Sequence, residues 1–127
     1  MSPAAHGVRR LGGCRKGTTA VEFAVLLPAF VMLIVGGMFS AGLVFTLAAM
    51  HFAVEDGARC ASVQTTICTN SSTIVSFAQS HYNGLVSPTF TYSPSGCGHT
   101  VTGTVTYTLD AGLKTFSVPL STSACYP

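Results

Sequence analysis

The chain has little charge and no tryptophan. Only 8% of its 127 residues are charged, whereas 48% are hydrophobic, and soluble domains usually carry about 25% charged residues. Residues 23–50 contain no charged side chain. Lysine and arginine are not clustered as a nucleic-acid surface requires, and tryptophan, a common platform for sugars, is missing. The composition therefore argues against nucleic-acid binding and favours a membrane protein over an ordinary soluble domain.

The uncharged run predicts one membrane-spanning helix. At about 1.5 Å of rise per residue, residues 23–50 would reach about 42 Å, which exceeds the roughly 30 Å hydrocarbon core of a bilayer. The alternative is a buried helix of a soluble core, but so small a domain rarely has room for a helix that is apolar on every face. We expect the helix to pass His51, at the headgroup boundary, and to end near Val63.

The basic residues are segregated along the chain. Four precede the apolar run and two follow it: Arg9, Arg10, Arg15 and Lys16, then Arg59 and Lys114. The positive-inside rule therefore predicts a cytoplasmic N-terminus and an exported C-terminal part. Cys14 lies in the cytoplasmic part, and the other four cysteines lie on the exported side, where disulfides persist.

The four exported cysteines predict two disulfides. Four cysteines allow three connectivities, and the sequence alone does not select one. We favour Cys68–Cys97, which would join a short helix to a strand, and Cys60–Cys125, which would tie the C-terminal tail to the long helix.

Residues 17–28 carry a recognisable motif. They read Gly-Thr-Thr-Ala-Val-Glu-Phe-Ala-Val-Leu-Leu-Pro and directly follow basic residues. This order resembles the pattern of type IV prepilins. In that pattern, basic residues precede a glycine, and after four further residues come a glutamate, an aromatic residue and a long apolar helix. More narrowly, the stretch resembles the start of the TadE-like family, minor pilins or pseudopilins of the tight-adherence (Tad/Flp) pilus machinery. Residues 53–59 resemble the segment that follows the helix in that family.

The resemblance implies a processing site and a set of partners. A membrane prepilin peptidase would cut between Gly17 and Thr18, and Glu22 and Phe23 would act in assembly. The partners would be the membrane, that peptidase, other pilin or pseudopilin subunits and the pilus assembly platform. The location would be the bacterial inner membrane, with a periplasmic C-terminal module, or a surface pilus after assembly.

Glu22 has two readings. A carboxylate at a membrane helix usually has a partner or a function. It could pair with the new α-amino group of Thr18, in its own subunit or in a neighbouring one. Alternatively, it reaches the headgroups and is favoured by the positive end of the helix dipole.

Two further features of the helix concern packing. Pro28 removes one backbone hydrogen bond and predicts a kink or a local loosening. Gly36/Ser40 and Gly37/Ala41 are pairs of small residues spaced by four, which let another helix approach closely, although small residues are common in membrane helices in any case.

The remaining chain predicts a small α+β module. Helical spacing runs from Ile74 to Leu85 after good N-cap residues, with Asn83-Gly84 as the stop. From Pro88 onward the period is two, which predicts a three-stranded antiparallel sheet with one threonine-rich face and Pro119 in an edge strand. The predicted organisation is a leader at 1–17, a transmembrane and extended helix at 18–64, and an exported module at 65–127, which is a pilin-like α+β fold.

We expect no catalytic residue, metal or cofactor. Cys97-Gly98-His99 places a thiol near an imidazole, and Cys60 and Cys68 could complete a zinc site. The spacings fit no zinc pattern well, and in an oxidising compartment disulfides are the simpler outcome. Two functions remain: a minor pilin, or a single-pass or secreted envelope protein unrelated to pili.

Overall fold

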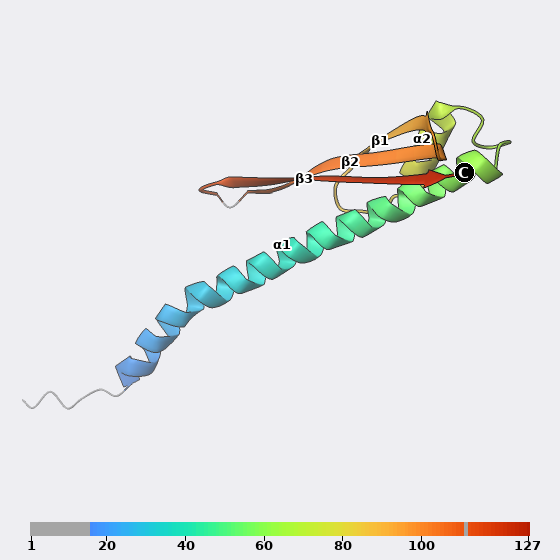
Figure 1. The fold of residues 1–127 in the computed structure, drawn as a ribbon. Helices are drawn as coiled ribbons and strands as arrows, with labels where there is room; N and C mark the ends of the chain where they lie inside the picture. The colour runs from blue at the N-terminus through green and yellow to red at the C-terminus, as the bar shows by residue number, and fades with distance from the viewer. Residues whose placement is uncertain (1–15, 111) are drawn as a thin grey trace, which may run out of the picture. The chain divides into compact units, whose positions relative to one another are not determined.

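The computed structural model describes residues 16–110 and 112–127. The elements follow in the order α1, α2, β1, β2, β3 (Figure 1). One long helix, one short helix and a three-stranded antiparallel sheet form an α+β fold, so the predicted fold class is confirmed. The expectations for the leader, including Cys14, concern residues outside the described part of the chain.

Helix α1 is the longest element. It covers Lys16–Val63, and Pro28 lies inside it without ending it. Because the proline ring carries no N–H, the carbonyl of Ala24 lacks its usual helical donor. The helix ends at Val63, as the sequence predicted, and Gln64 N donates a hydrogen bond of 2.9 Å to Cys60 O beyond that end.

Helix α2 covers Ser71–His81 and begins with a capping box at Asn70. The Asn70 side chain accepts a hydrogen bond of 3.0 Å from Thr73 N, and Asn70 N donates one of 3.1 Å to the Thr73 side chain. These bonds satisfy backbone groups that an uncapped helix end would leave unpaired. The helix ends before the predicted stop, since Tyr82 is already extended, and Leu85 therefore lies outside the helix and is exposed.

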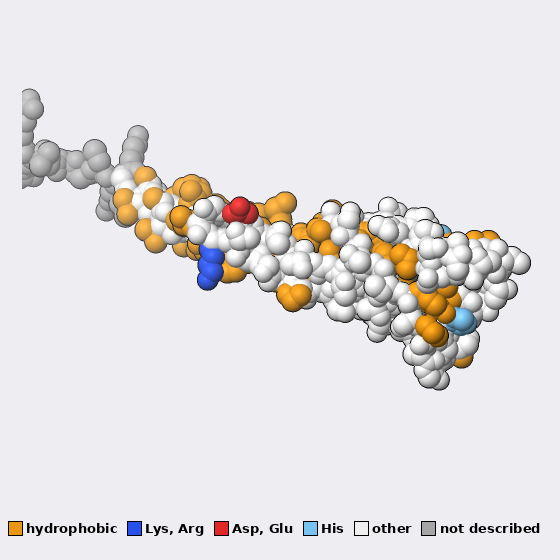
Figure 2. All heavy atoms as spheres, turned by 90° about the horizontal axis from the view of Figure 1, so that it is seen from above, with side chains coloured by type: hydrophobic (Ala, Val, Ile, Leu, Met, Phe, Trp, Pro, Cys, Tyr) orange, Lys and Arg blue, Asp and Glu red, His pale blue; other side chains and the backbone are white. Residues whose placement is uncertain are grey.

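The sheet has the strand order β1-β2-β3, with β1 at Thr89–Ser95, β2 at Gly98–Asp110 and β3 at Thr115–Tyr126. Along β2, Val101 and Gly103 are buried, and the threonines between and after them are more exposed. The threonines of β2 therefore make this part of the sheet polar and uncharged. Figure 2 shows few charged side chains on the face of the molecule that is seen from above. Pro119 lies opposite Thr106 in β3, an edge strand, where a missing N–H is tolerated.

The described chain divides into two units, with the boundary between Gly36 and Gly37. The core of the second unit combines three layers of residues, from α1, from α2 and from the inner sheet face. Its buried members are Ala53, Val54, Ala58, Cys60, Ala61, Cys68, Ile74, Ala78, Phe90 and Val101. The folded unit therefore includes the second half of α1 in addition to the predicted module at 65–127.

Candidate functional site

The second half of α1 presents one covered face. Its fully buried positions recur every three or four residues, which is the spacing of one helix face. The buried positions are Gly42, Thr46, Met50, Ala53, Val54, Gly57, Ala58, Cys60 and Ala61. A side chain at Gly57 would lie 3.1 Å from Ala78 Cβ and 3.5 Å from Val101, so this glycine lets α2 and β2 approach the helix.

Strand β2 runs back along this covered face. A side chain at Gly103 would lie 3.3 Å from Val54, whereas the Tyr107 ring lies 5.2 Å from the Phe39 ring and against Gly42. Contacts along β2 therefore move from the C-terminal end of α1 towards its middle. Phe39 is the first half-buried residue of α1.

The first half of α1 differs from the second half in its exposure. Among the residues whose side chains are described, all from Thr19 to Met38 are exposed. The helix from Thr19 onward is long and apolar enough to cross a membrane, with a mean hydropathy of 2.3 in its most apolar window. Large apolar side chains such as Met32 (78%), Leu33 (75%) and Val25 (70%) are exposed. Because contiguous apolar surface of this extent is unusual in water, the half-helix requires lipid or protein around it.

The predicted processing and assembly residues lie at the beginning of this exposed half. Gly17 and Thr18 belong to the first turns of α1, followed by Glu22 and by Phe23, which is 67% exposed. A side chain at Gly17 would meet nothing within 4 Å. The fold itself therefore does not require glycine at this position.

The small residues predicted to pack against another helix are exposed as well. Gly36, Gly37, Ser40 and Ala41 lie where α1 passes from the exposed half to the covered half. Side chains at Gly36 and Gly37 would meet nothing within 4 Å, and the Ser40 hydroxyl donates a hydrogen bond of 3.0 Å to Gly37 O. Within the second unit, Gly37, Ser40, Ala41, Val44, Phe45 and Ala48 line one shallow apolar hollow. This surface is open to a partner helix.

Residues 53–59 serve two purposes at once. Ala53, Val54, Gly57 and Ala58 are buried in the core, as described above, while the charged side chains of the segment are exposed. Glu55, Asp56 and Arg59 line a polar groove with Ser123, Ala124, Cys125 and Tyr126 at the end of β3. The segment thus presents its small residues to the sheet and its charges to the surface.

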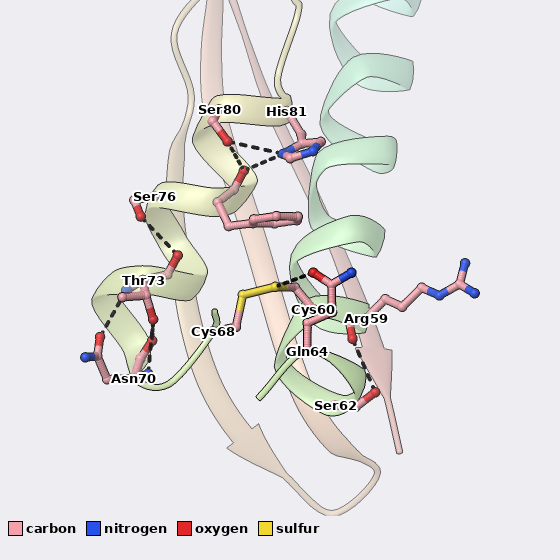
Figure 3. The surroundings of a disulfide bond; sticks show 11 residues. Arg59, Cys60, Ser62, Gln64, Cys68, Asn70, Thr73, Ser76, Ser80 and His81 are labelled. Atoms are coloured by element: carbon pink, nitrogen blue, oxygen red, sulfur yellow. Dashed lines mark hydrogen bonds between the residues drawn. A yellow bond between two sulfur atoms is a disulfide. The ribbon is translucent and has the colours of Figure 1, made fainter. Parts of the chain in front are cut away.

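The predicted cysteine pairing is wrong. The four cysteines form two disulfides, but these are Cys60–Cys68 and Cys97–Cys125, with Cα–Cα distances of 5.9 Å and 6.4 Å. Cys60–Cys68 joins the last turn of α1 to the segment before α2 (Figure 3).

The register of the sheet explains the second bridge. Cys97 lies in the β1–β2 turn, and Cys125 pairs with Thr100 three residues later. Antiparallel pairing of β2 and β3 therefore brings Cys125 to that turn. Cys68 lies in the segment before α2, where it is bridged to Cys60. Both bridges are more local than the sequence suggested.

The residues considered above for a zinc site, Cys60, Cys68, Cys97 and His99, make disulfides and side-chain contacts instead. Cys97 is bridged to Cys125, and His99 Nδ1 lies 2.7 Å from the Tyr92 hydroxyl, with the two rings stacked. His81 stacks on Phe77, and its Nδ1 lies 3.0 Å from Phe77 O. These contacts fix side chains at the module surface.

Comparison with known proteins finds one family model that matches part of the chain. Residues 17–59 match the family model described as TadE-like protein. The match begins at Gly17 and ends at Arg59, so it covers both segments that carry the resemblance and confirms it. No curated protein and no solved structure matches the chain.

Sequence reasoning missed the covered face of α1. The signal was present as small or adaptable residues at helical spacing, including Gly42, Thr46, Met50 and Gly57. It was hidden because residues 42–50 are also apolar on their other faces, as in a membrane span. A small residue that recurs on one face can indicate close packing of a sheet as well as of a helix.

Proposed function

We propose that the protein is a minor pilin or pseudopilin, a structural subunit of Tad (type IV-like) pilus assembly, without catalytic function. The observation that carries the proposal is the family match, which starts at Gly17. Exposed apolar surface from Thr19 to Met38 provides the membrane-spanning part. The location is the bacterial inner membrane, with a cytoplasmic N-terminus and a periplasmic module.

Processing between Gly17 and Thr18 fits the local structure. The fold has room for a side chain at Gly17, yet the residue is glycine. A peptidase that binds the backbone closely at this position supplies the missing reason, because only glycine lacks a Cβ that would obstruct the approach. Cleavage would free the α-amino group of Thr18.

Glu22 would then direct assembly. In the exposed half of α1, Glu22 lies four residues after Thr18, on the same face. An unpaired charge at low dielectric costs several kcal/mol, and a close opposite charge offsets much of that cost. Pairing of Glu22 with the amine of a neighbouring subunit would therefore favour helices that dock in the correct register.

The open small-residue surface would receive the neighbouring helix. Side chains added at Gly36 or Gly37 would meet nothing within 4 Å among the described residues, so there is space beside them for another helix. Small residues at such a surface let helix backbones approach closely. The hollow between Gly37 and Ala48 continues this surface into the folded unit.

The mass of the mature protein tests the proposal. Protein recovered from the membrane should begin at Thr18, and Gly17→Val should keep its full length. An intact chain, or cleavage after the apolar run, would support an envelope protein unrelated to pili. A Gly17→Val variant still trimmed to Thr18 would exclude this peptidase.

Glu22 can be tested separately by assembly. Glu22→Gln keeps the shape of the side chain and removes its charge. We expect normal cleavage and membrane insertion with reduced recovery of the protein in assembled pili. Normal assembly of this variant would show that charge pairing is not the mechanism.

A further inference from the structure

One face of α1 stays uncovered in the folded unit. Away from the covered face, exposed side chains recur every three or four residues, which is the spacing of one helix face. Phe52 is 68% exposed, Val63 is 65% exposed and Phe45 is 52% exposed, so large apolar side chains lie at the surface. All members of this outward face belong to the unit that begins at Gly37: Phe45, Ala48, Phe52, Asp56, Arg59 and Val63.

The chemistry of the outward face changes along its length. Apolar side chains precede Asp56 and Arg59, which carry opposite charges, and Val63 ends the row. Side chains three residues apart on a helix can pair. Among the described residues, however, the one contact between acidic and basic side chains joins His51 Nδ1 to Glu55 Oε1, at 3.7 Å. Asp56 and Arg59 are therefore available to the charges of another molecule.

Packing within the unit does not account for these two charges. Gly57 and Ala58, which lie between them in sequence, supply the contacts with the core. Asp56 and Arg59 line a shallow hollow on each side of α1, one beside the end of β3 and one beside α2. Figure 3 shows the Arg59 side chain extending away from α2. The two charged side chains thus lie on a ridge with open space on both flanks, which suits the approach of another helix.

Charge decides which helix fits this face. Subunits that share one membrane and one orientation present α1 in parallel, and parallel helices in register bring equivalent positions together. Two copies of this chain would therefore place Asp56 beside Asp56 and Arg59 beside Arg59, and like charges on neighbouring positions are destabilising. A parallel helix with the opposite order, basic and then acidic, would make an attractive contact at both positions. The outward face is complementary to a different chain and not to itself.

We propose that the outward face binds a parallel helix of a second, different subunit, which carries Lys or Arg opposite Asp56 and Asp or Glu opposite Arg59. The apolar side chains on either side, Phe52 and Val63, supply contact area, and the two charges select the partner. The inference rests on the proposed role in assembly, because that role makes neighbouring helices parallel. It adds that the exported half of α1 favours a mixed pair of subunits over a pair of identical ones.

A charge-exchanged copy of the chain can serve as the test partner. Asp56→Arg/Arg59→Asp supplies the opposite order of charges, and both native side chains are exposed, so the fold tolerates the change. Native and exchanged full-length chains carry tags of different length, together with Cys14→Ser and Phe52→Cys. They are mixed in equal amounts in phosphatidylethanolamine/phosphatidylglycerol vesicles and oxidised. Disulfide cross-links at position 52 report parallel contact along the outward face, and the tags distinguish mixed from identical pairs.

We expect mixed pairs to exceed random pairing by about threefold or more, since each exposed charge pair contributes modestly. The preference should fall towards random pairing at 1 M salt, where the Debye length is about 3 Å. Asp56→Asn/Arg59→Gln is the matched neutral control. It should pair at random with either chain, and it should form more identical pairs than the native chain because the repulsion is gone. His51→Cys, which lies off the outward face, should cross-link far less than Phe52→Cys.

Three results would overturn the proposal. Random pairing of native and exchanged chains would show that charge does not select the partner, and so would a preference that salt does not change. Equal cross-linking of His51→Cys and Phe52→Cys would show that the outward face is not a specific contact. Cross-links at Val25→Cys, in the exposed half of α1, without any at Phe52→Cys would overturn this contact alone. Absence of cross-links at both positions would count against the helix packing that the proposed function requires.

Discussion

Residues 23–38 and residues 39–50 of helix α1 are both uncharged and apolar, but their surroundings differ. Residues 19–38 are exposed on every side, whereas residues 39–63 bury one face against α2 and the sheet. Hydropathy hardly distinguishes residues 23–38 from residues 39–50, since both are apolar. The difference lies in spacing: Gly42, Thr46, Met50, Ala53 and Gly57 form a line of positions that lets the sheet approach. One continuous helix is therefore exposed along its first half and covered by protein on one face along its second half.

Two methionines of α1 provide the strongest contrast. Met50 is fully buried, whereas Met38 is 72% exposed. We expect Met50→Ala to lower the free energy of unfolding by about 2–5 kcal/mol, because it leaves a cavity in the core. Met38→Ala should stay within about 0.5 kcal/mol. Urea unfolding in detergent micelles, followed by tyrosine fluorescence, measures both, and equal losses would contradict the division of the helix.

Both disulfides lie in the folded unit, so they should stabilise that unit and not the exposed half of α1. Closure of loops with sequence separations of 8 and 28 residues contributes about 2.5 and about 3.6 kcal/mol in the chain-entropy model. Cys97→Ala/Cys125→Ala should therefore cost more than Cys60→Ala/Cys68→Ala in the same unfolding experiment. Peptide mapping without reduction should recover these two pairs, and recovery of Cys68–Cys97 would contradict the structure.

Substitutions at two glycines distinguish packing within the chain from packing between chains. A side chain at Gly42 would collide with the Tyr107 hydroxyl and lie 3.2 Å from Tyr107 Cζ, whereas Gly37 has open space. Gly42→Val should destabilise the isolated protein by about 1–3 kcal/mol through overpacking. Gly37→Val should leave that stability unchanged and weaken assembly, as measured by recovery in pili. A Gly37→Val variant as unstable as Gly42→Val would show that both glycines pack within the chain.

The smallest expected effect is a dependence on alkaline pH in the folded unit. Burial raises the pKa of Tyr82 above 10.0, and its hydrogen bond to Val86 O acts in the opposite direction. Because the folded state holds this proton more tightly, the contribution of Tyr82 is complete below about pH 10 and declines as pH rises through the folded value.

Tyr82→Phe is the matched control for that effect. Urea midpoints measured between neutral pH and strongly alkaline pH should fall less steeply in this variant than in the native protein. Parallel curves would show that Tyr82 does not carry the effect.

The sequence was sufficient for elements whose signal is local. The capping residues at Asn70, the alternation along β2 and the edge proline at Pro119 each rest on neighbours in the chain, and these predictions agree with the structure. The motif at Gly17–Pro28 predicted the family model that matches residues 17–59. Cysteine pairing depends instead on strand register, which brings Cys125 to the β1–β2 turn, and no local pattern encodes that meeting.

The change from the exposed half to the covered half of α1 could not be predicted from local sequence either. An apolar residue predicts burial without telling whether lipid or protein covers it. The sequence predicts His51 at the headgroup boundary because it is the first ionisable residue after the run. The contacts of Tyr107 with Phe39 and Gly42 show that protein covers the helix well before that point.

Oxidation of the native methionines tests the two environments of α1 most directly. With the protein in vesicles, hydrogen peroxide should oxidise neither Met32 nor Met50, as read by peptide mass spectrometry. After reduction and urea have unfolded the module, Met50 should become oxidised while Met32 stays protected, because Met50 is buried within the folded unit whereas Met32 is 78% exposed. Continued protection of Met50 would place it in lipid, and oxidation of Met32 before unfolding would exclude it from the membrane; either result would contradict the account.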